Sequence, residues 1–160
     1  MDLDTLELLI RRARVEHDCN PGASSDDIAA AEQRLGYTLP EDLKRVLIAA
    51  DGIRFWTEGD YPCRLLSTSE IEAARSLLSS GDGPPGIIAI IEVESDFAGI
   101  DLDPRSSSFG HLIDCSHETF PDELSGVCDS ISAALELVLG CNGQEWLSPA
   151  VLAYDVDFAE

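Results

Sequence analysis

A change of hydrophobic period at Gly52 is the feature that most constrains the fold of this chain. Before it, apolar residues recur every three or four positions, which is the spacing of amphipathic helices. After it, short apolar segments alternate with turn residues, which is typical of strands. One more helical pattern occurs late in the chain, with Val127, Ile131, Leu135 and Val138 on one face. Helices, a sheet and a closing helix predict an α+β fold.

Three helices are predicted in the N-terminal third. The first spans residues 3–16, with its arginines towards the C-terminal end, where cations complement the helix dipole. The second starts at the N-cap sequence of residues 24–27 and ends at Gly36. The third has Pro40 at its first position and ends at the turn of residues 51–52. These helices are expected to pack on a small antiparallel sheet.

The rest of the chain predicts that sheet and the closing helix. A hairpin joins residues 53–57 to 63–67, and a helix runs from Thr68 or Ser69 to about Leu78. Three strands at 87–93, 97–103 and 109–115 predict an antiparallel meander, and a helix at 125–139 ends at Gly140. No repeat or long linker divides the chain, so residues 1–160 are expected to form a single domain.

The charge of the chain is strongly acidic and unevenly distributed. It has 31 acidic and 10 basic residues, a formal net charge of −21, of which residues 51–160 contribute −17. Nucleic acid and anionic membranes attract Lys and Arg, so both are excluded as partners. A basic protein is the partner that this surface would attract. The alternative is that the acidity serves only solubility.

Cysteine usage and the N-terminus predict a cytoplasmic protein. The five cysteines are an odd number with no C-x-x-C pair, which favours reduced thiols. The first residues lack the basic and apolar regions of a secretory signal. The longest apolar run, residues 86–91, is much shorter than the roughly 20 residues of a membrane-spanning helix.

A metal site is the first chemical alternative, because His111, Asp114, Cys115 and His117 lie close in sequence. On a strand, however, His111 and Cys115 share their face with Ile113, which predicts core rather than a ligand cluster. The paired ligand spacing of structural zinc sites is also absent from the sequence. No metal and no cofactor are predicted.

Catalysis is the second alternative. The sequence contains no G-x-S-x-G elbow, no glycine-rich phosphate loop and no H-E-x-x-H helix. Its closely spaced carboxylates alternate with apolar residues, as on the solvated face of a strand. We therefore predict no catalytic residues, and an enzyme with a concealed carboxylate site is the least favoured hypothesis.

A partner-binding surface is predicted on the meander. Nine acidic residues and one basic residue, Arg105, lie between Glu92 and Glu123. Aromatic residues can anchor protein interfaces, although in a small α+β domain they belong more often to the core. Phe97 is one aromatic candidate for such an anchor. The predicted contact residues are Glu92, Glu94, Asp96, Asp101 and Asp103, with Trp56 and Tyr61 as the aromatic anchors.

Several short motifs resemble one family. They are Pro21-Gly22-Ala23-Ser24, Ile28-Ala-Ala-Ala-Glu32, Leu35-Gly36, Leu39-Pro40-Glu-Asp-Leu43 and Asp51-Gly52. In this order they resemble the opening of the SUKH superfamily, although Asp51 stands where that family usually has Asn. The resemblance is strongest over residues 20–52 and extends to about residue 140, through a strand pair at 95–103 and the closing helix.

The resemblance implies a fold and a function. SUKH proteins pack N-terminal helices on an antiparallel sheet, and most bacterial members are immunity proteins that neutralise a polymorphic toxin, often a nuclease. Nuclease toxins are typically basic because they bind phosphate, which agrees with the acidic charge of this chain. The predicted function is therefore that of an immunity protein for a basic cognate toxin. Because the family also includes fungal cell-wall and signalling regulators, a regulatory scaffold remains the alternative.

Overall fold

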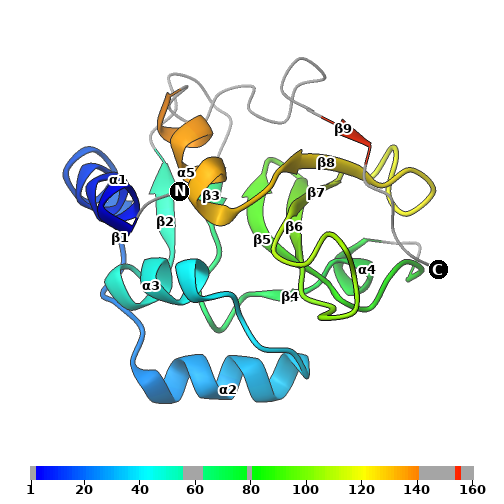
Figure 1. Cartoon of the computed structure of the whole chain (residues 1–160), viewed down its shortest axis with the longest axis horizontal. Helices are drawn as coiled ribbons and strands as arrows, with labels where there is room; N and C mark the ends of the chain where they lie inside the picture. The colour runs from blue at the N-terminus through cyan, green and yellow to red at the C-terminus, as the bar shows by residue number, and fades with distance from the viewer. Residues whose placement is uncertain (1–2, 56–62, 79–80, 141–153, 156–160) are drawn as a thin grey trace.

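A computed structural model describes residues 3–55, 63–78, 81–140 and 154–155 (Figure 1). Its helices are α1 (Leu3–Glu16), α2 (Ser25–Leu35), α3 (Glu41–Ala49), α4 (Ala74–Leu77) and α5 (Ile131–Gly140). Its strands are β1 (Asp18–Cys19), β2 (Ile53–Phe55), β3 (Cys63–Leu65), β4 (Glu72–Ala73), β5 (Ile87–Val93), β6 (Asp96–Asp101), β7 (Leu112–Cys115), β8 (Ser125–Cys128) and β9 (Tyr154–Asp155).

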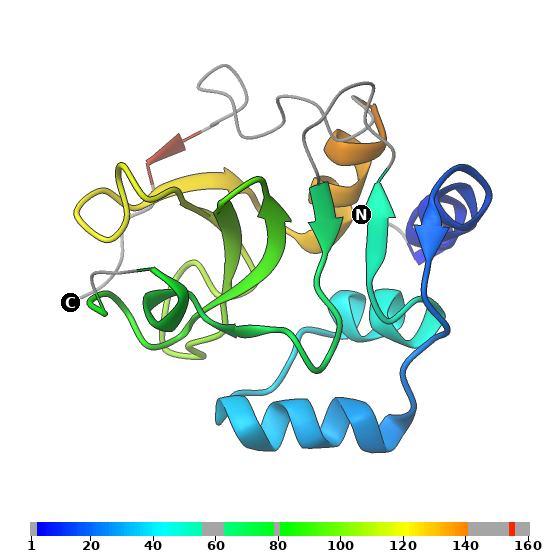
Figure 2. The same cartoon turned by 180° about the vertical axis from the view of Figure 1, so that it is seen from behind.

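All these strands belong to one antiparallel sheet. Its order is β1-β2-β3-β5-β6-β7-β8-β9, and β4 pairs with β5 beside that path. Figures 1 and 2 show α1, α2 and α3 gathered at the β1–β3 half of the molecule and α4 at the other half. The predicted α+β fold, with N-terminal helices on an antiparallel sheet and a closing helix, is confirmed.

The ends of α2 follow from the local sequence. Ser24 is the N-cap: its Oγ accepts the backbone N–H of Asp27 at 3.1 Å, and Asp27 accepts the N–H of Ser24 at 2.9 Å. Gly36 ends the helix in the left-handed region, with φ of 77°. Pro40 is the N-cap of α3 rather than its first helical residue, a difference of one position from the prediction.

The main hydrophobic core lies between the sheet and helices α1, α3 and α5. Leu6 of α1 and Leu47 of α3 are almost completely buried, and so is Leu135 of α5. On the sheet, Ile53 and Phe55 of β2 face this core. The three helices therefore cover one face of the sheet.

A second, smaller cluster covers part of the opposite face. Its members are Ala74, Ile87, Ala89, Ile113, Cys115 and Phe120. They come from α4, from β5 and β7, and from the connection after β7. Strands β5 to β7 are consequently buried on both faces, whereas β2 and β3 bury alternate residues and leave Arg54 and Arg64 outside the core.

An irregularity in β5 changes which face its residues occupy. The register to β6 shifts between Ala89 and Ile91, so Ile90 is an extra residue on β5. Ile90 and Ile91 both belong to the main core, and Glu92 then faces the opposite side, in register with Arg64 of β3. The bulge thus determines the direction of every side chain that follows it on the strand.

Two of the predicted elements were wrong in detail. The helix predicted at 125–139 begins only at Ile131, because residues 125–128 form β8 and pair with β7. Val127 contributes to the main core from strand β8. Its four-residue spacing to Ile131 therefore does not reflect a shared helix face. The helix predicted from Thr68 to Leu78 is a turn, then β4, then the four-residue α4, because pairing with β5 holds the middle of this segment extended.

Two general expectations can be compared with the structure. No helix among the described residues is long and apolar enough to cross a membrane. Cys19, Cys63, Cys115 and Cys128 are free thiols. Burial raises the pKa of Cys128 to about 12 and the pKa of Cys115 further still, so neither thiol forms a thiolate near neutral pH.

Candidate partner-binding surface

The tight turn between β5 and β6 presents three of the predicted contact residues. Glu94 is exposed and has φ of 56°, a left-handed conformation that the turn requires. Glu92 and Asp96 flank it at the ends of the two strands and are partly exposed. The structure therefore places Glu92, Glu94 and Asp96 close together at this turn.

Asp96 also holds the connection that follows β7. Its Oδ1 accepts the backbone N–H of His117 at 2.7 Å and lies 2.7 Å from Nδ1 of the same residue. The hydrogen bond and charge of Asp96 raise the pKa of His117, whose side chain is exposed. Glu118 follows His117 and is exposed. We use the term acidic turn for Glu92, Glu94, Asp96 and Glu118.

Glu92 is fixed by an ion pair across the sheet. It pairs with Arg64 on β3, and the same guanidinium lies 2.5 Å from Glu70. These two carboxylates raise the pKa of Arg64. Burial opposes ionisation of Glu70, but hydrogen bonds from Ser67 and Arg64 outweigh it and lower the pKa of Glu70. The acidic turn is thereby anchored to β3.

Asp101 does not lie on a solvated face, contrary to the expectation from its alternation with Leu102. Its side chain is only 2% exposed. It accepts the hydroxyl of Ser108 at 2.7 Å and the backbone N–H of Asp103 at 3.0 Å. The carboxylate therefore organises the loop between β6 and β7 and is not available to a partner.

Asp103 is separated from the acidic turn by the length of β6. Because the six residues of β6, Asp96–Asp101, are extended, Asp103 lies about 17 Å or more from the acidic turn. Asp103 pairs with Arg105 at 2.8 Å, and the hydrogen bonds from Arg105 lower the pKa of Asp103 to about 2. The five acidic residues thus form two groups at opposite ends of β6 rather than one surface.

The predicted aromatic anchors have different outcomes. Trp56 and Tyr61 lie outside the described residues. Phe97 is half-buried and packs against both hydrophobic clusters. Phe109 is 42% exposed, in the loop between β6 and β7, and sequence reasoning missed it.

An open polar surface on the sheet was also missed. Paired residues of successive strands form a cross-strand row of Asp18, Arg54, Arg64, Glu92, Phe97 and Cys115. Over β1–β3 the side chains of this row are charged, and they are not buried. At β7 the row ends in Cys115, which is buried in the second hydrophobic cluster. The signal was present in the sequence, since Arg54 and Arg64 each stand between two apolar residues at 53–55 and 63–65.

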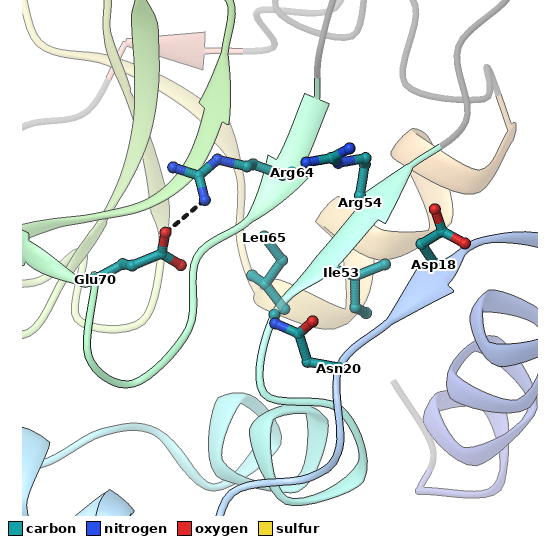
Figure 3. Close-up of a pocket in the computed structure, with 8 residues that line it drawn as sticks. Asp18, Asn20, Ile53, Arg54, Arg64, Leu65 and Glu70 are labelled. Atoms are coloured by element: carbon teal, nitrogen blue, oxygen red, sulfur yellow. Dashed lines mark hydrogen bonds and ion pairs between the residues drawn. The ribbon is translucent and has the colours of Figure 1, made fainter.

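A hollow of about 260 Å³ lies over the charged end of this row. Figure 3 shows Arg64 reaching towards Glu70 at one side of the hollow, with Arg54, Asp18 and Asn20 around it. Among the described residues no ion pair joins Arg54 to a carboxylate, although Asp18 is its register partner. Arg54 is therefore a cation at this hollow that pairs with no carboxylate in the described part of the chain.

The residues considered for a metal site are used in other ways. Cys115 is fully buried in the second cluster, and Asp114 is buried and accepts the backbone N–H of Ser116 at 3.1 Å. Burial, together with the nearby charge of Asp96, raises the pKa of Asp114. Across the described ranges, no group of three or more His, Cys, Asp or Glu side chains is placed to hold a metal ion.

The fold defines a class of protein: an α+β protein with N-terminal helices packed on an antiparallel sheet. The chain belongs to the SMI1 / KNR4 family (SUKH-1), whose model matches residues 22–137. This confirms the resemblance to the SUKH superfamily. A search of curated proteins gives no match to the chain.

Family membership gives the function in general terms. The protein is immunity-like or SMI1-like, and members of this family are generally non-catalytic immunity or regulatory proteins. The match covers the cap of α2, helix α3, the acidic turn and most of α5, but it does not cover α1.

Proposed function

We propose that the protein is an immunity protein that binds a basic cognate toxin, such as a nuclease toxin, and neutralises it by covering its active surface. The observation that carries the proposal is the net charge of −21 in a member of this family. A surface that binds phosphate is basic, and an acidic inhibitor can occupy it in place of phosphate. The mechanism needs no cofactor and no catalytic residue, and we propose a cytoplasmic location.

The acidic turn is the contact that we propose. Glu94 and Glu118 are exposed, and neither has an ion pair with a described residue. Glu92 and Asp96 are held by Arg64 and His117, so part of the surface is already ordered before binding. Ordered groups lose less conformational entropy on association, which favours affinity.

Asp101 and Asp103 have no part in the revised contact. Asp101 is buried, and Asp103 is paired with Arg105 at the far end of β6. Trp56 and Tyr61 remain proposed anchors on sequence grounds alone.

The test is co-expression with the product of the neighbouring gene, followed by pull-down and measurement of association rates. We expect a one-to-one complex whose association rate falls steeply as salt is raised from about 50 to 500 mM. Glu94→Lys should lower the association rate by about tenfold, whereas Glu136→Lys, the same charge change at an exposed position on α5, should have a much smaller effect. Equal effects of both variants would remove the acidic turn from the interface.

A second candidate is a regulatory scaffold that binds an endogenous partner. Arg54 in the hollow, which pairs with no described carboxylate, favours it, because a basic toxin would not be attracted to this position. The same pull-down tests this second function. Retention of housekeeping proteins only, lost in Arg54→Glu and kept in Glu94→Lys, would establish it.

A further inference from the structure

Helix α1 presents an outward face that nothing in the described part of the chain covers. Leu8 is 64% exposed and Val15 is 86% exposed on α1, and Ile48 of the neighbouring α3 is 54% exposed. Figures 1 and 2 both show α1 at the edge of the molecule, away from the acidic turn between β5 and β6. Large apolar side chains exposed on one side of a helix favour an interface there.

The charges on α1 are separated along the helix. Asp4 and Glu7 lie in its first half, and Arg11 and Arg14 lie in its second half, all four exposed. Glu7, Arg11 and Arg14 have no ion pair with a described residue, whereas Arg12 is used within the fold, bound to Glu16 and to the carbonyl of Leu139. This face is balanced in charge on a chain whose net charge is −21.

A groove of about 600 Å³ runs between α1 and α3 beside this face. It is lined by Asp4, Glu7, Leu8 and Arg11 of α1 and by Arg45 of α3. The Nε of Arg45 is buried and has no hydrogen-bond partner among the described residues, and Glu41 approaches it only to 3.8 Å. The groove therefore combines apolar surface with a cation whose hydrogen bonding is incomplete.

We propose that α1 is a self-association surface that pairs with α1 of a second copy of this chain, in antiparallel orientation around a two-fold axis. An axis at the level of Leu9 places Glu7 opposite Arg11 of the second copy, and the same axis places Asp4 opposite Arg14. Leu8 lies at one flank of this charged face, about 80° around the helix from its centre. One axis satisfies both charge pairs at once, as an isologous interface requires.

A second copy fits this face better than a partner of one charge sign. A wholly basic partner would be repelled by Arg11 and Arg14, and a wholly acidic one by Asp4 and Glu7. Other faces of two copies carry the remaining negative charge and repel one another. A single 14-residue helix is about 21 Å long, so the buried area is at the low end for specific interfaces and the dimer is weak.

The experiment is sedimentation velocity from about 10 to 300 µM at physiological ionic strength, where the Debye length is about 8 Å. The wild-type chain should show a concentration-dependent dimer. Arg11→Glu and Glu7→Arg should each weaken self-association by about tenfold, because each variant faces its own copy with like charges. An equimolar mixture of the two should recover the dimer, since every pair is then of opposite sign.

Arg54→Glu is the matched control: it makes the same charge change on the open sheet face and should leave the dimer unaffected. Circular dichroism verifies that each variant is folded. A monomeric wild type throughout the range, or single variants whose mixture stays monomeric, would overturn the proposal. The proposed toxin contact is tested separately. A toxin complex that survives Arg11→Glu is compatible both with a chain that dimerises through α1 and with one that does not.

Discussion

Asp96 and His117 are joined twice, since one carboxylate oxygen accepts the backbone N–H of His117 at 2.7 Å and lies 2.7 Å from its Nδ1. The interaction raises the pKa of His117. A raised folded-state pKa contributes stability that is fully present below the unfolded pKa of about 6.5 and is lost as pH rises through the folded value.

The first prediction follows from this linkage. His117→Ala should lower the melting temperature at pH 5.5 by more than it does at pH 8.5, because only the protonated imidazole forms an ion pair with Asp96. In an NMR titration, Asp96→Asn should bring the His117 pKa back towards 6.5. An unchanged His117 pKa in that variant would exclude Asp96 as the cause.

Arg64 gives a second prediction. It is half-buried between Glu70 and Glu92, so Arg64→Met leaves two carboxylates without their cation. We expect a loss of about 1 kcal/mol in the free energy of unfolding, measured by urea denaturation. Arg54→Met is the matched control on the paired strand and should cost less than about 0.5 kcal/mol, since Arg54 is exposed. Equal losses for the two variants would contradict a structural role for Arg64.

The third prediction separates structure from binding at two acidic residues. Asp101→Ala should cost about 2 kcal/mol of stability, because it leaves the buried hydroxyl of Ser108 without its acceptor. Glu94→Ala should cost less than about 0.5 kcal/mol. Thermal or urea unfolding measures both. Once a partner is identified, the two variants should differ in the opposite sense in binding. The affinity for the partner should fall in Glu94→Ala, and the folded fraction of Asp101→Ala should bind as the wild type does.

Gly22 supplies the fourth prediction. The segment at residues 21–23 runs against α3, where the N–H of Ala23 donates to Leu47 at 2.9 Å. A Cβ at Gly22 would lie 1.8 Å from the carbonyl oxygen of Ile48, which is backbone and cannot rotate away. Gly22→Ala should therefore destabilise the protein by about 3 kcal/mol or more. Gly140→Ala, where a Cβ meets nothing within 4 Å, is the control and should be nearly neutral.

The three N-terminal helices could be predicted from sequence because their signals are local. The capping box of Ser24 and Asp27 and the left-handed Gly36 depend only on residues a few positions apart. Gly22 was part of the family motif, but the reason for it, an approach to α3, requires the tertiary structure.

The acidic surface could be predicted only in part because alternation does not show what covers a strand. Asp101 alternates with apolar residues like an exposed side chain, yet β6 is buried on both faces at that end. The link between Arg64 and Glu92 depends on the register of β3 against β5, which no local pattern encodes. The α1 surface lies outside the family match, so the motif gave no indication of it.

The extra residue Ile90 in β5 makes the acidic turn sensitive to strand length. Strict alternation from Ala89 would direct Glu92 into the main core and Ile91 away from it, the reverse of their observed positions. Deleting one isoleucine would remove the extra residue and leave Glu92 on its observed face, whereas inserting one residue after Ile91 would turn Glu92 into the main core without removing any charged residue. An insertion at this point, rather than a deletion or a point substitution, is the change that would most directly disconnect Glu92 from Arg64.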